Sequence, residues 1–484
     1  MLCYSLNKQG LGLNILKGLV AGLVFAAVMA QAGEPPLPAL PGFHPDPSIC
    51  RAGDTYYLIT SSFTWYPGLP IYASKDLREW TLVGHACGGE EWKSLANIPD
   101  ASLGLWAPSI RYFDGKFHVA CTRIDSVPKT KSNPRGRRYR NFVVTATDPA
   151  GPWSKSIGIK GLWGIDPGLF RDTDGKTYLV NPSGIIQTRI PHQNMISVYS
   201  FDPATGVLGK QTRLTTGRNT HSVYAEGPHL FRMRNGQYLL TVAEGGTGWA
   251  HEVTAFLSES VEGPFVPCAH NPVITRRDQP RDPLSATGHA DLVESPDGKL
   301  YAVFLAVRRD ARGGLLPFGR ETFLCPATFD EGRQELRFDD AHLIAGTIRE
   351  PRELIYRSAN PGTRLRRVVA TSDSEQAVAT RAGEGLVIER SASHMLKLVR
   401  TADAVEVVKT YRGKPETLAR VPVGKDAVAL KLELADGMIR CFAGPSADKL
   451  TRIPGEWPWN FIADGPGFLG PGIGTVGLGC DFLR

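Results

Sequence analysis

A pattern of apolar runs broken by tight turns recurs five times along residues 43–345. In each copy an apolar run of strand length reaches a Gly-Asp, Asp-Gly or Asn-Gly turn, and a second apolar or aromatic run follows it. The turns lie at residues 53–54, 114–115, 174–175, 235–236 and 297–298. Each copy therefore predicts two antiparallel strands joined by a short turn.

The five copies are regularly spaced. Subtracting the numbers of their head residues gives intervals of 60, 60, 60 and 63, and the heads are Asp46, Trp106, Asp166, Glu226 and His289. A period of this length accommodates one four-stranded propeller blade, so five copies predict a five-bladed β-propeller. If the first strand of each copy is innermost in its blade, the five heads converge on one end of the central axis.

The pattern changes after residue 345. A connector is followed by strand-like runs at residues 385–389, 404–408, 427–434, 438–442 and 474–478, several of which alternate apolar and polar positions. Such alternation is typical of sheets buried on one face. We therefore predict an all-β protein with a propeller at residues 33–345, and a connector and C-terminal β-sandwich at residues 346–484.

The first 32 residues resemble a secretory signal peptide. Lys8 and Lys17 precede an apolar run at residues 18–28, and Ala30-Gln31-Ala32 offers a cleavage site. An uncleaved anchor is the alternative, but the apolar run is short for a bilayer span. We expect an exported protein, periplasmic or extracellular, with no membrane attachment after cleavage.

The charge of the chain gives no reason to expect a nucleic-acid partner. The formal net charge is +7, and it falls to +5 without residues 1–32, which hold two lysines and no acid. The densest cationic stretch, residues 129–140, contains Gly and Pro between two strand-like segments. We interpret it as a solvated loop, because one short run supplies few phosphate contacts and no recognition fold accompanies it.

The cysteines do not form a recognisable framework. Seven remain after residue 32, an odd number, and they are widely scattered without a C-x-x-C metal spacing. We expect mostly buried thiols, with a few disulfides left open as an alternative.

Three of the five head residues, Asp46, Asp166 and Glu226, are acidic. If they share one cavity they cannot all ionise at ordinary pKa values, so at least one proton is retained near neutrality. Glycoside hydrolysis needs such a set, in which one carboxyl protonates the leaving oxygen and another activates water or attacks the sugar. Alone, each aspartate would suit a turn before proline, and Glu226 an ion pair with arginine. Their common phase in the repeat favours a site.

Several motifs together resemble glycoside hydrolase family 43. They are residues 41–48, 106–108, 164–170, 225–230, 243–247 and 288–292, and residues 319–324 with the extra β-domain point to its β-xylosidase branch. The resemblance implies a five-bladed propeller and an inverting mechanism without metal or cofactor. It implies that Asp46 is the general base, Glu226 the general acid, and Asp166 the residue that raises the pKa of the acid and orients it. Inversion requires ~6.5–9.5 Å between base and acid.

The same resemblance implies a set of substrate-binding residues. Arg320 matches an arginine that holds sugar hydroxyls, His289 matches an axial histidine, and pocket-lining positions are matched by Phe63, Trp106 and Thr247. Packing between blades remains the alternative for the two aromatic residues, and a surface ion pair for Arg320. In some relatives the axial histidine faces a central ion; we predict no metal here.

Phe468 resembles a loop residue that reaches from the sandwich to wall off the pocket. A wall there would make the pocket blind and the enzyme exo-acting.

The resemblance to the β-xylosidase branch makes release of β-1,4-linked xylose from the non-reducing ends of xylo-oligosaccharides the first hypothesis. An α-L-arabinofuranosidase acting on arabinoxylan or arabinan fragments is the alternative. A non-catalytic carbohydrate-binding propeller and a structural, partner-binding propeller are more remote. The oligomeric state is left open.

Overall fold

The structure, a computed structural model, describes residues 35–185, 193–217, 223–310, 313–350, 356–357, 362–370, 372–463 and 469–477. The expected signal peptide at residues 1–32 lies outside these ranges. No helix among the described residues is long and apolar enough to cross a membrane.

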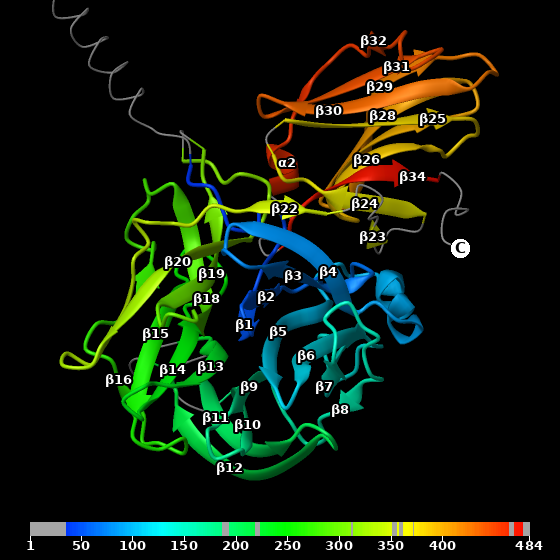
Figure 1. The fold of residues 1–484 in the computed structure, drawn as a ribbon. Helices are drawn as coiled ribbons and strands as arrows, with labels where there is room; N and C mark the ends of the chain where they lie inside the picture. The colour runs from blue at the N-terminus through cyan, green and yellow to red at the C-terminus, as the bar shows by residue number, and fades with distance from the viewer. Residues whose placement is uncertain are drawn as a thin grey trace, which may run out of the picture.

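Five antiparallel sheets follow one another around a common axis (Figure 1). Blade one contains β1 (Ser48–Ala52), β2 (Thr55–Ile59), β3 (Gly68–Ser74) and β4 (Glu79–Cys87), and blade two contains β5 (Gly104–Phe113), β6 (Lys116–Ser126), β7 (Arg137–Ala146) and β8 (Ile157–Gly158). Blade three contains β9 (Gly168–Arg171), β10 (Thr177–Ile185), β11 (Asn194–Asp202) and β12 (Val207–Thr215). Blade four contains β13 (Glu226–Arg232), β14 (Tyr238–Glu244), β15 (Glu252–Ser258), β16 (Val266–Pro267) and β17 (Ile274–Thr275). Blade five contains β18 (Leu284–Glu294), β19 (Leu300–Arg308), β20 (Glu321–Asp330) and β21 (Glu335–Phe338). The predicted five-bladed propeller is confirmed.

The first strand of each blade is the innermost one, as the repeat predicted. β1 contacts β5 and β18, and β9 contacts β5 and β13, so the five first strands form a ring around the axis. Each continues through a turn into the second strand of its blade, for example Ala52 opposite Thr55 in blade one. The short 3₁₀ helix η1 (Glu90–Asn97) connects blades one and two.

The ring is closed by the segment that precedes β1. The backbone N–H of Leu40 donates to the carbonyl of Thr322 (3.1 Å), and that of His44 donates to the carbonyl of Arg320 (3.1 Å). The hydroxyl of Thr322 donates to the carbonyl of His44 (2.6 Å). Closure therefore places the segment from Leu40 to His44, two residues before Asp46, against blade five.

The C-terminal region consists of two sheets that share one hydrophobic core. The seven-stranded sheet contains β23 (Tyr356–Arg357), β24 (Thr363–Arg367), β34 (Gly472–Val476), β26 (Gly385–Ser391), β27 (His394–Arg400), β28 (Ala404–Tyr411) and β29 (Lys414–Pro422). The five-stranded sheet contains β25 (Asp373–Ala379), β30 (Val428–Ala435), β31 (Met438–Gly444), β32 (Thr451–Arg452) and β33 (Trp457–Pro458). Helix α2 (Asn460–Ala463) contacts β26 and β27. Leu386 and Leu396 of the first sheet pack with Leu430 and Ile439 of the second, the layer arrangement of a sandwich.

Arg367 of β24 ties the C-terminal region to blade one. This buried side chain donates to the carbonyl of Phe43 (3.1 Å) and to Glu350 (2.9 Å), and it reaches the hydroxyl groups of Tyr72 and Tyr356. In addition, β22 (Thr347–Arg349) extends blade one by pairing in parallel with β4. The segment leading to Asp46 is thus held from both sides.

The sequence pattern missed several strands. The repeat marked two strands in each copy, so the outer strand β12 of blade three was not anticipated; nor were β25, β27 and β29 in the C-terminal region. β12 and β29 are largely exposed, so they lack the apolar signature on which the prediction rested. The basic stretch at residues 129–140 was also interpreted wrongly in part, because Arg137–Arg140 belong to β7 rather than to a loop.

The thiols follow the expectation of buried, unbridged cysteines. Six are described, and all are buried and free: Cys50, Cys87, Cys121, Cys268, Cys325 and Cys441. Cys480 lies outside the described residues.

Candidate active site

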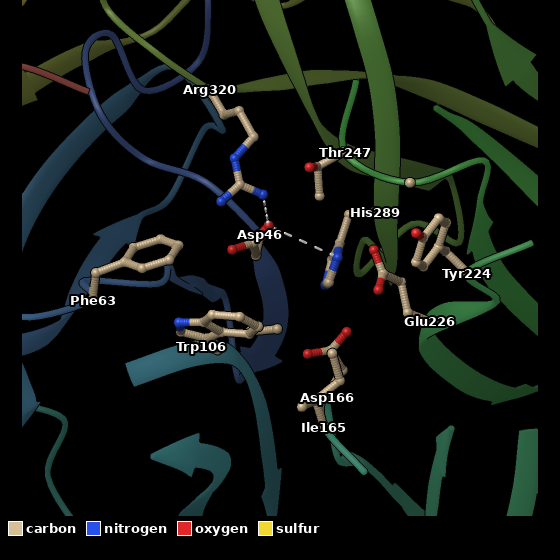
Figure 2. A pocket seen from close by; sticks show the side chains of 12 residues that line it. Asp46, Phe63, Trp106, Ile165, Asp166, Tyr224, Glu226, Thr247, His289 and Arg320 are labelled. Carbon is tan, nitrogen blue, oxygen red and sulfur yellow. Dashed lines mark hydrogen bonds and ion pairs between the residues drawn. The ribbon is translucent and has the colours of Figure 1, made fainter. Parts of the chain in front are cut away.

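A cavity of about 380 Å³ opens at one end of the propeller axis (Figure 2). Among the residues that line it are eight of the nine site residues predicted from the sequence: Asp46, Phe63, Trp106, Asp166, Glu226, Thr247, His289 and Arg320. They come from all five blades and the closing segment. The ninth, Phe468, lies outside the described residues. Convergence of the head residues, inferred from the repeat, is therefore observed, while their roles remain predictions.

Asp46 is a buried carboxylate with strong partners. Arg320 forms an ion pair with it, the hydroxyl of Ser61 donates to its Oδ2 (2.7 Å), and Nδ1 of His289 lies 3.9 Å from its Oδ1. Burial alone would raise the pKa of Asp46, but the guanidinium of Arg320 and the hydrogen bond from Ser61 hold it below its ordinary value. Asp46 is therefore ionised at neutral pH.

Glu226 lines the same cavity, but its pKa is shifted in the opposite direction. Burial, followed by the negative charge of Asp46, raises its pKa from 4.5 to about 7. Burial and the nearby charges of Glu226 and Asp46 also raise the pKa of Asp166, whose Oδ2 accepts a hydrogen bond from the backbone N–H of Gly227 (3.1 Å). That bond ties Asp166 to the peptide that follows Glu226. The cavity thus holds a proton on this pair near neutrality.

The three carboxyl groups therefore differ in the way that acid–base catalysis requires. Asp46 can accept a proton, and Glu226 can donate one, because their surroundings move their pKa values in opposite directions. Figure 2 shows the side chains of Asp46, Glu226 and Asp166 gathered around one space, with Phe63 and Trp106 on one side of it. Such a space suits a sugar ring, whose apolar faces pack on aromatic residues.

Backbone conformation at the cavity is strained in several places. Six lining residues other than glycine have positive φ, between 37° and 54°: Asp46, Phe63, Ala107, Asp166, Tyr224 and His289. Side chains with a Cβ adopt this region infrequently, and functional sites are where such residues cluster. Six such residues around one cavity mark it as a functional site.

Histidines and an ion pair fill the axis beneath the cavity. The ring of His289 packs against Gly227, where any Cβ would lie 2.7 Å from the imidazole. Further along the axis, His229 contacts Arg111, which forms a buried ion pair with Asp291 (2.8 Å). Burial lowers the pKa of both His289 and His229. Across the described ranges, no three His, Cys, Asp or Glu side chains are grouped to hold a metal ion.

Several lining residues were missed by sequence reasoning. They are Ala107, Ile165, Tyr224 and Gly246, and Ser61 adds a contact because its hydroxyl accepts a hydrogen bond from the N–H of Ala107 (2.6 Å) while donating to Asp46. All of them lie within two residues of a predicted site residue: Ser61 and Tyr224 two residues before Phe63 and Glu226, and the others directly beside one. Nearness in sequence to a predicted site residue was therefore a usable signal.

Known glycoside hydrolases are similar to this chain in sequence. The profile of glycosyl hydrolases family 43 matches residues 36–333. A non-reducing end alpha-L-arabinofuranosidase of Bacteroides ovatus is 39% identical over 295 residues, which are 60% of this chain and 51% of that protein. A putative beta-xylosidase of Escherichia coli is 38% identical over 306 residues, which are 61% of this chain and 55% of that protein. The chain spans about half the length of the curated relatives it matches.

Solved structures resemble a larger part of the chain. A xylan beta-1,4-xylosidase from Bacillus halodurans superposes with a TM-score of 0.80 at 26% identity, over 91% of this chain and 95% of that one. A Bacteroides ovatus protein of a xyloglucan utilisation locus has a TM-score of 0.78 at 28% identity, with the same coverage. The likeness therefore includes the C-terminal region as well as the propeller.

Proposed function

The chain belongs to glycosyl hydrolases family 43, and from that premise we propose that it releases single β-1,4-linked xylose units from the non-reducing ends of xylo-oligosaccharides. One observation carries the proposal: a single cavity holds an ionised Asp46 and, on Glu226, a carboxyl group with a pKa of about 7. This combination of a base and an acid is what glycoside hydrolysis requires.

The proposed reaction inverts the configuration at the anomeric carbon. Asp46 takes a proton from a water molecule, whose oxygen forms the new bond to the anomeric carbon. Glu226 gives its proton to the glycosidic oxygen as the bond from that oxygen to the sugar breaks. Asp166 is proposed to keep Glu226 oriented through the backbone of Gly227, and its coupling to Glu226 keeps a proton on the pair.

The remaining lining residues are proposed to hold the terminal sugar. Arg320 offers guanidinium donors to hydroxyl groups while pairing with Asp46, and its guanidinium carbon lies 5.7 Å from the centre of the Phe63 ring. Trp106 and Thr247 complete an apolar and a polar side of the cavity. At about 380 Å³ the cavity is at the small end for ligand sites, which favours one sugar unit over a polymer cleft.

Exo-action is supported from the side of the C-terminal region. Leu469 packs with Phe43 and Phe63 in a buried cluster, and Gly470 approaches the backbone of Phe318 so closely that a Cβ would lie 2.4 Å from its carbonyl oxygen. The chain that follows the predicted loop residue Phe468 therefore packs against the rim beside Arg320. A wall there would restrict the cavity to chain ends.

An α-L-arabinofuranosidase is the second candidate, because one of the similar proteins carries that name. The ratio of kcat/KM on 4-nitrophenyl β-xyloside and 4-nitrophenyl α-L-arabinofuranoside separates the two candidates. We expect the xyloside to be turned over faster. Faster turnover of the arabinofuranoside would replace the first candidate with the second.

The full proposal is tested on linear xylo-oligosaccharides with the product followed by NMR. We expect xylose to appear first as the α-anomer, one unit at a time. An initial β-anomer would contradict inversion, and longer initial products would contradict exo-action. Binding of these oligosaccharides without hydrolysis of any pentoside would support a carbohydrate-binding propeller. We also propose, from the pattern of residues 1–32, that the protein is exported.

A further inference from the structure

A second, larger concavity adjoins the candidate active site. It measures about 1020 Å³ and shares four lining residues with the smaller cavity: Trp106, Ile165, Tyr224 and Glu226. Asp46, Phe63 and Arg320 line the smaller cavity only. We call the larger concavity the basic groove, because five arginine and lysine side chains line it.

Cationic side chains dominate the groove. Five of them line it, and Glu226 is the only acidic lining residue in the described part of the chain; the five are Arg135, Arg137, Arg138, Arg140 and Lys160. Four come from the basic stretch that the sequence had suggested to be a solvated loop. The fifth, Lys160, follows β8, the outer strand of blade two.

Local acids neutralise only part of this charge. Arg140 (2.6 Å) and Arg138 (3.6 Å) share one carboxylate, that of Asp125, which also pairs with Arg123. Arg137 lies 3.9 Å from Asp100. No ion pair is recorded for Arg135 or Lys160 within the described ranges. The groove therefore has a net positive charge that is not satisfied by the protein itself.

Glu226 determines which part of the substrate enters the groove. As the proposed acid it must reach the oxygen of the leaving group, and it lines both concavities, whereas the proposed base lines only the smaller one. The terminal sugar therefore occupies the small cavity beside Asp46, and the remainder of the chain extends past Glu226 into the groove.

Aromatic side chains give the groove the character of a sugar-binding surface. Trp163 is 78% exposed and Tyr139 is 43% exposed, and both line the groove. Exposed aromatic rings beside cations offer a stacking face for a sugar ring and charge for a substituent of that ring.

We propose that the basic groove selects leaving groups that bear a negatively charged substituent, such as the carboxylate of a uronic acid or a sulfate ester on the oligosaccharide. The proposal rests on the proposed function, because it assigns the groove to the leaving side of that reaction. Guanidinium groups bind both kinds of anion through paired N–H donors.

The test compares three trisaccharides that differ only in one substituent. Each is a xylobiose with an unsubstituted non-reducing unit; the reducing-end unit carries a glucuronic acid branch, the same branch with its carboxyl group reduced to a hydroxymethyl group, or that reduced branch bearing a sulfate ester. We expect kcat/KM for xylose release to be about 5-fold higher with an anionic branch than with the reduced one, the size expected from two exposed ion pairs. The uronate and sulfate arms show which anion is preferred.

Variants of the groove tie this preference to its residues. In the double variant Arg135→Gln, Lys160→Gln, the ratio of kcat/KM on the anionic substrates to kcat/KM on the neutral one should fall towards one. The matched control is Lys116→Gln, an exposed lysine at the opposite end of β6 from Asp125, where the ratio should not change. The preference should also shrink as ionic strength rises.

Two outcomes would overturn the proposal: equal kcat/KM on all three substrates, or a preference that survives loss of Arg135 and Lys160. If none of the three releases a pentose, the proposed function fails instead. In that case calorimetric binding of the same trisaccharides tests the proposal for the groove. We expect the anionic trisaccharides to bind more tightly than the neutral one, and equal binding would contradict the proposal.

Discussion

The small cavity and the basic groove share four lining residues, but the charges of the cavity are mostly buried whereas those of the groove are exposed to solvent. In the cavity Asp46, Asp166 and Arg320 are buried and Glu226 is partly buried, and the neighbouring charges shift the pKa values of the carboxyl groups. In the groove the cations are partly exposed, for example Arg138 at 59% and Arg140 at 50% of the side chain. Buried charge changes protonation, whereas exposed charge attracts a ligand and is weakened by salt.

The largest effect expected from this comparison is the loss of the buried base. Asp46→Asn leaves no group to accept the proton of water, so kcat should fall by at least ~10²-fold, and equally on a xylo-oligosaccharide and on an activated aryl xyloside. Steady-state rates on the two substrates measure it. A loss confined to one of them would contradict the assignment of Asp46.

Loss of the buried acid should be selective. Glu226→Gln should lower kcat on xylobiose by at least ~10²-fold, but much less on 2,4-dinitrophenyl β-xyloside, whose leaving group departs without protonation. The comparison of the two substrates in this variant, with Asp46→Asn as the control, tests the division of roles. Equal losses in Glu226→Gln would contradict a general acid.

The same substitution should stabilise the fold at higher pH. Because the pKa of Glu226 is raised from 4.5 to about 7, the unfolded chain releases this proton more readily, and stability falls as pH rises across that interval. Glu226→Gln removes this cost, which is at most about 3 kcal/mol above pH 7 and absent below pH 4.5. Thermal denaturation at pH 4.5 and pH 8 should show a gain in Tm only at pH 8.

The matched control for stability is Glu331→Gln on the exposed surface, which should leave Tm unchanged at both pH values. A gain in Tm for Glu226→Gln that is the same at pH 4.5 and pH 8 would contradict the raised pKa.

Arg320 should set the position of the pH profile. Its charge lowers the pKa of both Asp46 and Glu226, so Arg320→Gln should raise both. Wild-type kcat/KM should decline as pH rises through about 7, where Glu226 loses its proton. In the variant the whole profile should move to higher pH, whatever its residual rate. An unmoved alkaline limb would show that Arg320 acts on substrate alone.

The smallest effect should come from the exposed cations. On the uronate-bearing trisaccharide, raising the salt concentration from about 0.05 M to about 0.5 M should lower kcat/KM by a few-fold, because the Debye length falls well below 10 Å. The reduced trisaccharide should respond little. If salt lowered kcat/KM equally on the two substrates, the exposed cations of the groove would not be binding the anionic branch.

Sequence reasoning was most successful where chemistry follows the repeat. The regular spacing of the five head residues predicted the five blades and the convergence of Asp46, Asp166 and Glu226, because each innermost strand must begin at the same end of the axis. It failed for strands whose residues are mostly exposed, such as β12, and for Arg137–Arg140 at the start of β7, because polar strands carry no alternating signal.

The sequence by itself thus determined the propeller architecture and which carboxyl groups line the cavity. Only the tertiary structure decided their protonation and the use of the surrounding charges. Asp46 is ionised because Arg320, 274 residues away in the chain, is brought against it when the ring closes. The basic stretch becomes one wall of a groove because residues of blade two, Pro182 and Asn194 of blade three, and Glu226 of blade four line the same space. Both depend on distance and burial between residues remote in sequence, which no local pattern encodes.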